Sequence, residues 1–186
     1  ESQLAFIEKY QPDFIGIYVN LMTKVNVLKI ITAVKKSPEL QHCKIILGGP
    51  EVRNHVDNFL KHGADVIVLG EGEITFHEVI NTLQQKKDLL TVKGVCYKNS
   101  MNEIIHTAER EKIKDLDTLP FPNRKKVNLQ LYLDAWKKHH GKNAISISTM
   151  RGCPYTCKWC SRAVYGLSYR RRSAANVVDE MEQLKS

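Results

Sequence analysis

The chain has 186 residues, of which 42% are hydrophobic and 26% charged, the ordinary composition of a soluble globular protein. No run approaches the roughly 18 consecutive apolar residues of a transmembrane helix, and the first residues lack the features of a secretory signal. The first residue is Glu1 rather than Met, so we expect the sequence to be part of a longer polypeptide.

The net charge of +8 is distributed unevenly along the chain. Residues 1–120 contain 15 basic and 16 acidic side chains, whereas residues 121–186 contain 13 and 4. This change in composition, near residues 116–126, predicts a boundary between two regions. The basic region is expected either to attract an anionic ligand or substrate, or to present a solvated or nucleic-acid-binding surface.

Strand and helix patterns alternate through the first half of the chain. The predicted elements, in chain order, are a strand at 13–19, a helix at 23–37, a strand at 44–49, a helix at 51–63, a strand at 64–73 and a helix at 74–85. Two short strands at 92–99 and 102–107 then predict a small antiparallel hairpin. The alternation predicts an α/β fold, a flavodoxin-like parallel sheet with helices on both faces, over residues 1–110.

The second half has fewer regular patterns. Residues 111–143 are interpreted as a linker that contains a helix at 129–140. A strand is predicted at 144–150, and a helix at 173–185 with Ser173 as its N-cap. The apolar residues of that last helix fall on one face and are Val177, Val178, Met181 and Leu184.

Ligands of open parallel sheets bind at the carboxyl ends of the strands. In this chain those ends are followed by the segments "NLMT" (20–23), "GGPE" (48–51) and "GEGE" (70–73). The glycines in them would let the backbone approach a bulky ligand closely. The alternative, that these glycines only turn the chain, stays open.

Five cysteines make a closed disulfide framework unsuitable, because the number is odd and a chain of this kind fits a reducing cytoplasm. Cys43 and Cys96 stand in apolar surroundings and are expected to be buried. Cys153, Cys157 and Cys160 lie within eight positions in "CPYTCKWC". Three thiolates on one loop suit a 4Fe–4S cluster, whose fourth iron is then open to a non-protein ligand.

Two alternatives to the cluster remain. A redox pair would use only Cys157 and Cys160, and a zinc site would need a fourth ligand from the distant His106, His139 or His140. With zinc, the basic region would form a nucleic-acid-binding module on an α/β scaffold. A brown sample with iron and sulfide would support the enzyme, whereas a colourless sample with zinc would support the module.

The C-x3-C-x2-C motif after a predicted strand resembles that of the radical S-adenosylmethionine (radical SAM) enzymes. The segments "ILGGPE", "ADVIVLGEGE" and "DLDTLPFPNR" are similar to recurring segments of the branch in which a cobalamin-binding domain precedes the barrel. Within it, the chain most resembles the anaerobic magnesium-protoporphyrin IX monomethyl ester cyclases and the cobalamin-dependent methyltransferases. The resemblance implies a cobalamin-binding domain at 1–110 without its N-terminal strand, a linker at 111–143, and the start of a truncated radical SAM barrel at 144–186.

The resemblance also implies roles for residues near the cysteines. Cys153, Cys157 and Cys160 would bind three irons, and the open iron would take the amino and carboxylate groups of SAM. Reductive cleavage of SAM would give a 5′-deoxyadenosyl radical that abstracts hydrogen from a small-molecule substrate. Trp159 would pack near the adenine or simply cover the cluster. The expected partner is a one-electron reductant protein in the cytoplasm, with neither a membrane nor nucleic acid.

The first domain would contribute the corrin-binding face. The residues expected to line it are Asn20, Thr23, Gly48, Gly49, Gly70, Glu71 and Gly72. The chain contains no D-x-H-x-x-G motif, so that motif's histidine, the lower cobalt ligand, is missing. The barrel needs further βα units, so we expect the 186 residues alone to be inactive in turnover. The resemblance identifies no substrate and does not decide between methylation and cyclisation.

Overall fold

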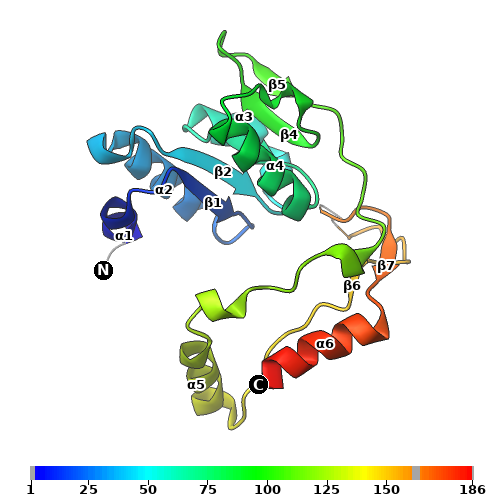
Figure 1. Ribbon diagram of the computed structural model, residues 1–186. Helices are drawn as coiled ribbons and strands as arrows, with labels where there is room; N and C mark the ends of the chain where they lie inside the picture. The colour runs from blue at the N-terminus through cyan, green and yellow to red at the C-terminus, as the bar shows by residue number, and fades with distance from the viewer. Residues whose placement is uncertain (1–2, 161–163, 186) are drawn as a thin grey trace. The chain divides into compact units, whose positions relative to one another are not determined.

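The computed structural model describes residues 3–160 and 164–185 and divides into two compact units (Figure 1). Unit 1 comprises residues 1–112 and 161–166, and unit 2 comprises residues 113–160 and 167–186. The longest helices among the described residues have 13 residues. None of the helices in this part of the chain is long and apolar enough to cross a bilayer, which takes about 20 residues.

Unit 1 is an α/β domain built on a five-stranded sheet with the strand order β1-β2-β3-β4-β5. Its elements are α1 (Gln3–Tyr10), β1 (Phe14–Tyr18), α2 (Lys24–Lys36), β2 (Lys44–Gly48), α3 (Val56–Lys61), β3 (Val66–Val68), α4 (Gly72–Gln84), β4 (Val95–Lys98) and β5 (Ile104–His106), with 3-10 turns at Pro38–Leu40, Val52–His55 and Leu89–Thr91. The first three strands are parallel, and β4 and β5 extend the sheet in antiparallel fashion. The predicted fold class and the predicted hairpin are confirmed.

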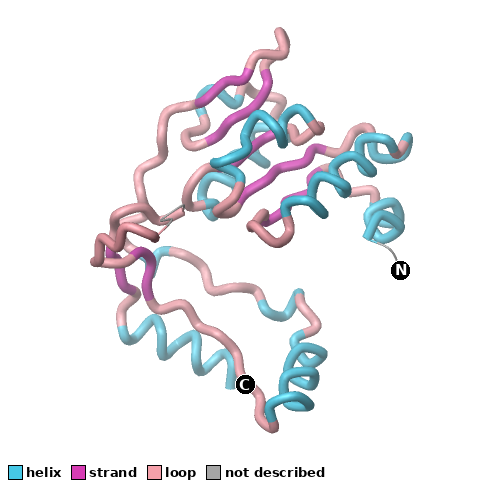
Figure 2. The backbone as a smooth tube through the Cα atoms, turned by 180° about the vertical axis from the view of Figure 1, so that it is seen from behind, coloured by secondary structure: helices cyan, strands magenta, loops and turns pink. Residues whose placement is uncertain are grey.

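The core of unit 1 lies on both faces of this sheet, because alternate residues of its strands point to opposite sides. In β2, Ile45 and Leu47 belong to the cluster that includes residues of α2 and α3, whereas Ile46 belongs to the cluster beneath α4. All three side chains are at most 1% exposed. Figure 2 shows the helices on the two sides of the sheet. Each fully buried aliphatic side chain contributes about 1.5–3 kcal/mol of transfer free energy.

Three elements of unit 1 differ from the sequence-based expectation. The helix predicted at 51–63 begins with the 3-10 turn Val52–His55 before α3, and the strand predicted at 64–73 is limited to β3. After β3 the backbone leaves the sheet at Gly70, which has a φ of 78°. Helix α1 was not expected, because none of its residues is buried and its apolar pattern is correspondingly weak.

Unit 2 contains two helices and a small hairpin among its described residues. Its elements are α5 (Leu129–His140), β6 (Met150–Gly152), β7 (Tyr169–Arg171) and α6 (Ala174–Lys185), with 3-10 turns at Leu116–Thr118 and Arg124–Lys126. Strands β6 and β7 are antiparallel. The predicted cap of the last helix is confirmed, because the Ser173 hydroxyl oxygen accepts the backbone N–H of Asn176 at 3.1 Å.

The strand predicted at 144–150 is wrong in its extent. Residues 144–149 have no regular structure, and only Met150–Gly152 form a strand. A strand forms stably only where neighbouring backbone accepts and donates its hydrogen bonds. The described residues of unit 2 supply β7 as a neighbour for three residues, and they supply no parallel strand for the preceding six.

Unit 2 also differs from unit 1 in what it buries. Among its described residues only Leu116 and Glu180 are buried. The expected apolar face of α6 remains partly open, with Val178 50% and Met181 54% exposed. Helix α6 is therefore anchored in unit 2 through a carboxylate rather than through its apolar stripe.

Candidate functional site

The carboxyl ends of the parallel strands form one edge of unit 1 (Figure 1). In the register of β1 and β2, Tyr18 lies opposite Gly48, and the backbone N–H of Val19 donates to the Gly48 carbonyl at 2.7 Å. The turns after the strands therefore lie on the same side of the sheet. The residues predicted to line a ligand on this edge are Asn20, Thr23, Gly48, Gly49, Gly70, Glu71 and Gly72.

Asn20 and Thr23 form a hydrogen-bonded turn after β1. The Asn20 Oδ1 atom accepts the backbone N–H groups of Met22 and Thr23, both at 3.0 Å. The Thr23 hydroxyl oxygen accepts the backbone N–H of Asn20 at 3.1 Å. Both side chains are thus used to shape the turn, an arrangement typical of Asn and Thr at such positions.

The glycines of the edge fall into two kinds. Gly49 has a φ of 109°, and an added Cβ would lie 2.5 Å from the Val19 carbonyl oxygen, so this glycine is required by the turn itself. At Gly48 and Gly70 an added Cβ would meet no atom within 4 Å. Gly72 begins α4, and the nearest atom, Val68 Cγ1, would lie 4.0 Å away. Gly48 and Gly70 leave open backbone at the edge, as a closely approaching ligand requires.

Glu71 lies at the N-cap position of α4 but is only 8% exposed. Its carbonyl oxygen accepts the Thr75 hydroxyl at 3.4 Å, which joins the turn to the first turn of the helix. Glu71 is consequently part of the packed base of the third turn, whereas the two neighbouring glycines form its surface.

Exposed apolar side chains, which were not among the predicted site residues, lie beside these turns. Tyr18 is 67%, Leu21 65% and Met22 85% exposed. Large apolar groups at the ligand-binding edge of a sheet are typical of a site for a large, partly apolar ligand. The signal in the sequence is the apolar pair "LM" inside a predicted turn.

A charged cluster at the same edge was also missed. Glu51 Oε1 lies 2.9 Å from Lys24 Nζ and 3.1 Å from His55 Nε2, and Lys24 Nζ lies 3.3 Å from His55 Nε2. The hydrogen bond from Lys24 is the main cause that lowers the pKa of Glu51. The three side chains join the start of α2 to the turn after β2, and they keep this part of the edge in place.

The cysteine segment begins directly after β6, the first strand of the small antiparallel pair of unit 2. Gly152, the last residue of β6, has a φ of 79°, and a Cβ there would collide with the Ser168 carbonyl oxygen, so only glycine fits. Cys153 comes next in the chain. The Cys160 N–H donates to the Cys157 carbonyl at 3.2 Å, which places these two cysteines on one turn. All three thiols are free and exposed, and Trp159 is 89% exposed.

The structure does not gather the three thiols. The part of the chain that it describes contains no group of three or more His, Cys, Asp or Glu side chains placed to hold one metal ion. The assignment of Cys153, Cys157 and Cys160 as iron ligands therefore stays a prediction, as does the placement of Trp159.

The expectation for the other two cysteines is confirmed, since Cys43 and Cys96 are both 0% exposed. Burial raises the pKa of the Cys96 thiol to about 11 and also raises the pKa of Cys43. Their burial is that of small apolar side chains in the core, as the sequence predicts.

Comparisons with known proteins agree with this arrangement. Residues 1–80 match the family model of the B12 binding domain. The cobalamin-dependent radical SAM methyltransferase TokK of Streptomyces tokunonensis is 25% identical over 177 residues, which cover 92% of this chain and 25% of that protein. The anaerobic magnesium-protoporphyrin IX monomethyl ester cyclase of Synechocystis sp. is 30% identical over 140 residues, 74% of this chain and 27% of that protein. The family match therefore covers the first 80 residues, and over most of its length the chain is similar to a cobalamin-dependent radical SAM methyltransferase.

The fold of this family is also found by structural comparison. The chain superposes on the cobalamin-dependent S-adenosylmethionine radical enzyme OxsB, with aqua-cobalamin and S-adenosylmethionine bound, with a TM-score of 0.74 and 23% identity. The match covers 96% of this chain and 24% of OxsB. The chain spans 19–38% of the length of the curated relatives it matches.

Of the two candidate sites, one lies inside the residues that match the B12 binding domain and the other lies outside them. All seven residues predicted on the sheet edge lie within the matched residues 1–80, whereas the cysteine segment lies beyond them. The exposed apolar residues Tyr18, Leu21 and Met22 also lie inside the B12-binding match.

Proposed function

We propose that the protein containing this chain is a cobalamin-dependent radical SAM enzyme that methylates or oxidatively cyclises a carbon atom of a small-molecule substrate. One observation carries the proposal: a B12-binding domain with an open ligand edge is followed in the same chain by three free, exposed cysteines in C-x3-C-x2-C spacing. The relatives named above include both a methyltransferase and a cyclase.

The cysteine segment fits a 4Fe–4S cluster by the chemistry of its donors. Thiolates are the usual ligands of such clusters, and three of them leave one iron open. The chemistry that a bound cluster supplies is the transfer of one electron to the SAM sulfonium, which releases methionine and a 5′-deoxyadenosyl radical that takes a hydrogen atom from the substrate. The electron has to come from a one-electron reductant protein.

Each residue of the segment then has a stated task. Cys153, Cys157 and Cys160 would bind one iron each, and the hydrogen-bonded turn between Cys157 and Cys160 would keep two of these ligands near one another. Trp159, fully available at the surface of that turn, would cover the side of the cluster or the adenine of SAM.

The sheet edge of unit 1 fits a corrin ring in its shape and polarity. Gly48 and Gly70 leave space for close approach, and Tyr18, Leu21 and Met22 offer apolar contact. Cobalamin, when bound, supplies a redox-active cobalt centre. Because the D-x-H-x-x-G motif is missing, we expect the cobalt to be bound without that motif's histidine.

The cluster is tested by anaerobic reconstitution of the full-length protein and its Cys157→Ala variant. We expect the parent to contain iron and sulfide and to form 5′-deoxyadenosine from SAM, and we expect Cys157→Ala to lose both properties. Cys43→Ala makes the same chemical change at a buried cysteine of unit 1 and should retain them. A Cys157→Ala protein with an intact cluster, or a colourless parent with bound zinc, would overturn the proposal.

Cobalamin is tested by the visible spectrum of the same protein purified from cells supplied with the cofactor. Near-stoichiometric cobalamin supports a corrin site at the edge of unit 1. A protein that cleaves SAM but never binds cobalamin would refute the cobalamin part alone.

A further inference from the structure

Glu180 is the most deeply buried charged side chain in the described part of the chain. Its side chain is 2% exposed, and both carboxylate oxygens are engaged. Oε1 lies 2.6 Å from Arg124 Nη2, and Oε2 pairs with Arg172 Nη1. Burial alone would raise the pKa of Glu180, but the hydrogen bonds and charges of Arg172 and Arg124 outweigh it and lower the pKa. We call these three residues the Arg124–Glu180–Arg172 network.

Arg172 joins this network to the chain that leads into β6. Its Nη1 donates to the Ser148 carbonyl at 2.9 Å, and its backbone N–H donates to the Thr149 carbonyl at 3.0 Å. Its Nε donates to Asn176 Oδ1 at 2.6 Å, in the first turn of α6. One guanidinium therefore holds the entry to β6 and the start of α6 together.

The segment before α5 is attached to the same place. Arg124 belongs to the 3-10 turn that precedes α5, and the Phe121 ring lies 5.3 Å from the Arg172 guanidinium carbon. The Asp117 carboxylate accepts the backbone N–H of Ser173 at 3.0 Å. Residues 117–124, expected from the sequence to be a linker, are thus bound to α6 and to the residue that follows β7.

Strand β6 leads directly into the cysteine segment, and β7 follows that segment in the chain after residues 161–168. Met150 pairs with Arg171 and Gly152 with Tyr169, and Cys153 follows Gly152 directly. With so short a hairpin, the backbone pairing alone offers few contacts to hold its position. The Arg124–Glu180–Arg172 network adds contacts at this position. Arg172 directly follows β7, and it donates hydrogen bonds to the carbonyls of Ser148 and Thr149, which directly precede β6.

We infer that the Arg124–Glu180–Arg172 network positions the cysteine segment, by fixing both ends of the β6–β7 hairpin to α6 and to residues 117–124. The three residues touch no cofactor in this role, and they are positioning residues. The inference rests on the proposed function, because the side chains that would be positioned are the proposed cluster ligands. Its structural part, the anchoring of the hairpin, is measurable without a cluster.

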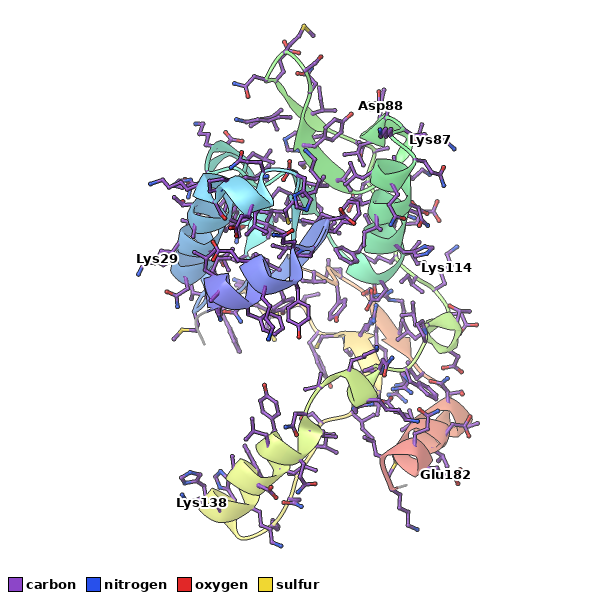
Figure 3. All side chains as sticks on the ribbon, turned by 60° about the vertical axis from the view of Figure 1, so that its left-hand side comes forward. Lys29, Lys87, Asp88, Lys114, Lys138 and Glu182 are labelled. Atoms are coloured by element: carbon purple, nitrogen blue, oxygen red, sulfur yellow. The ribbon has the colours of Figure 1, made fainter. Side chains whose placement is uncertain are left out.

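The test compares Glu180→Gln with Glu182→Gln in the full-length, anaerobically reconstituted protein. Glu182 lies on the same helix, is exposed and is labelled in Figure 3, so its substitution is a matched control. The first readout is amide hydrogen exchange in residues 148–153. We expect faster exchange there in Glu180→Gln and parent-like exchange in Glu182→Gln. Unchanged exchange in Glu180→Gln would overturn the anchoring.

The second readout is the cluster itself, followed by its electron paramagnetic resonance spectrum and by its rate of loss to an iron chelator. Partners that orient metal ligands typically change affinity by about tenfold or more when removed. We expect Glu180→Gln to lose its cluster about tenfold faster and with an altered spectrum. A purely structural role would lower the yield of folded protein but leave the spectrum and the loss rate of the folded fraction unchanged.

A second variant covers the case in which Glu180→Gln does not fold. Arg124→Lys keeps the positive charge but replaces the planar guanidinium by a more flexible ammonium. We expect intermediate values of exchange and cluster loss, and parent-like values would overturn the inference. If the parent itself binds no cluster, the proposed function fails, whereas a parent with a cluster and a Glu180→Gln protein identical to it refutes only the positioning role.

Discussion

Unit 1 and unit 2 differ in the kinds of side chain that they bury. In unit 1 two apolar clusters fill the faces of the sheet, and residues such as Ile31, Leu47 and Phe59 are at most 1% exposed. In the described part of unit 2 the buried residues are Leu116 and Glu180, and the contacts around Glu180 are ion pairs and hydrogen bonds. The buried contacts of the first unit are mainly apolar, whereas those in the described part of the second centre on one satisfied charge network.

This difference affects how each unit responds to change. The stabilisation that comes from apolar burial is spread over many side chains, does not depend on pH and has no directional requirement. A buried carboxylate depends on a few partners in fixed geometry, and removing one partner leaves an uncompensated charge. Unit 1 is therefore suited to carrying an open ligand edge on a rigid sheet, whereas unit 2 has its loop attached at a small number of points.

The largest effect is expected from breaking the core of unit 1. Phe59 on α3 is 1% exposed, and Phe59→Ala should lower the free energy of unfolding by about 3–5 kcal/mol, through lost transfer energy and the cavity left behind. The measurement is chemical denaturation followed by far-ultraviolet circular dichroism, with amide exchange in β2 to assign the effect to unit 1.

Phe6→Ala is the matched control, since the same truncation is made at a side chain that is 54% exposed. Its effect should stay within about 0.5 kcal/mol. Equal losses for the two variants would contradict the account of unit 1 as a domain stabilised by its two clusters.

The contrast between the units also explains which elements the sequence predicts. The strands and helices of unit 1 follow from the periodic burial of apolar residues, as in β2, where Ile45, Ile46 and Leu47 are all buried. The same kind of pattern at 144–150 predicts a strand that does not form, because β pairing depends on a neighbour that a local pattern does not contain.

Helix α6 shows the limit of periodicity most clearly. Its apolar residues Val178 and Met181 remain about half exposed, and Glu180, one of several charged residues in "VVDEMEQLK", is the buried one. Burial of that carboxylate depends on Arg124 and Arg172, of which Arg124 lies 56 residues earlier in the chain. No local signal marks such a long-range pair.

The candidate site was predicted to a similar extent. The seven edge residues lie at the carboxyl ends of the strands, as the topology rule predicts, and their role as ligand contacts stays a prediction. The φ of 78° at Gly70 also favours glycine, but an added Cβ would collide with the Val19 carbonyl oxygen only at Gly49, and the rule did not separate Gly49 from Gly48 and Gly70 in this respect. That separation depends on how close the Val19 carbonyl comes, a distance set by the tertiary structure.

Alanine substitutions at these glycines should have an intermediate effect. They distinguish a glycine of the unit 1 edge that is needed for folding from one that is needed for ligand binding. Gly49→Ala places a Cβ 2.5 Å from the Val19 oxygen in a left-handed backbone conformation, and should cost about 1–3 kcal/mol of stability. Gly48→Ala meets no atom within 4 Å and should leave stability unchanged or raise it by about 0.5–1 kcal/mol. Its methyl group would project into the approach of the corrin, so cobalamin affinity should fall.

Thermal unfolding and a cobalamin titration of both variants decide the matter. Gly48→Ala should unfold like the parent but bind cobalamin more weakly. If it binds cobalamin as the parent does, the open space at Gly48 is not part of the corrin site. If Gly49→Ala unfolds like the parent, the turn tolerates a side chain and the distinction between the two glycines is lost.

The smallest effect is expected from titration of the carboxylates of unit 2. This titration leaves the stability of the unit unchanged at neutral pH and lowers it only in acid. Burial alone would raise the pKa of Glu180, but Arg172 and Arg124 outweigh it and lower that pKa. Hydrogen bonds from Ser173 lower the pKa of Asp117. A lowered pKa in the folded state means that the unfolded state takes up the proton first as the pH falls. The stabilisation is therefore complete above the ordinary carboxyl pKa and is lost as the pH falls through the folded pKa.

The Lys24 hydrogen bond lowers the pKa of Glu51 in unit 1 as well, but this carboxylate lies at the sheet edge and the apolar clusters beneath it do not titrate. On acidification, the amide signals of Ser173 and Arg172 in nuclear magnetic resonance spectra should shift and broaden at a higher pH than those of Ile46 and Leu47. In Glu180→Gln the acid transition of unit 2 should be reduced to the part due to Asp117. A single acid transition at one pH for all four amides would show that the charge network is no weaker in acid than the apolar core, and the contrast between the two units would fail at that point.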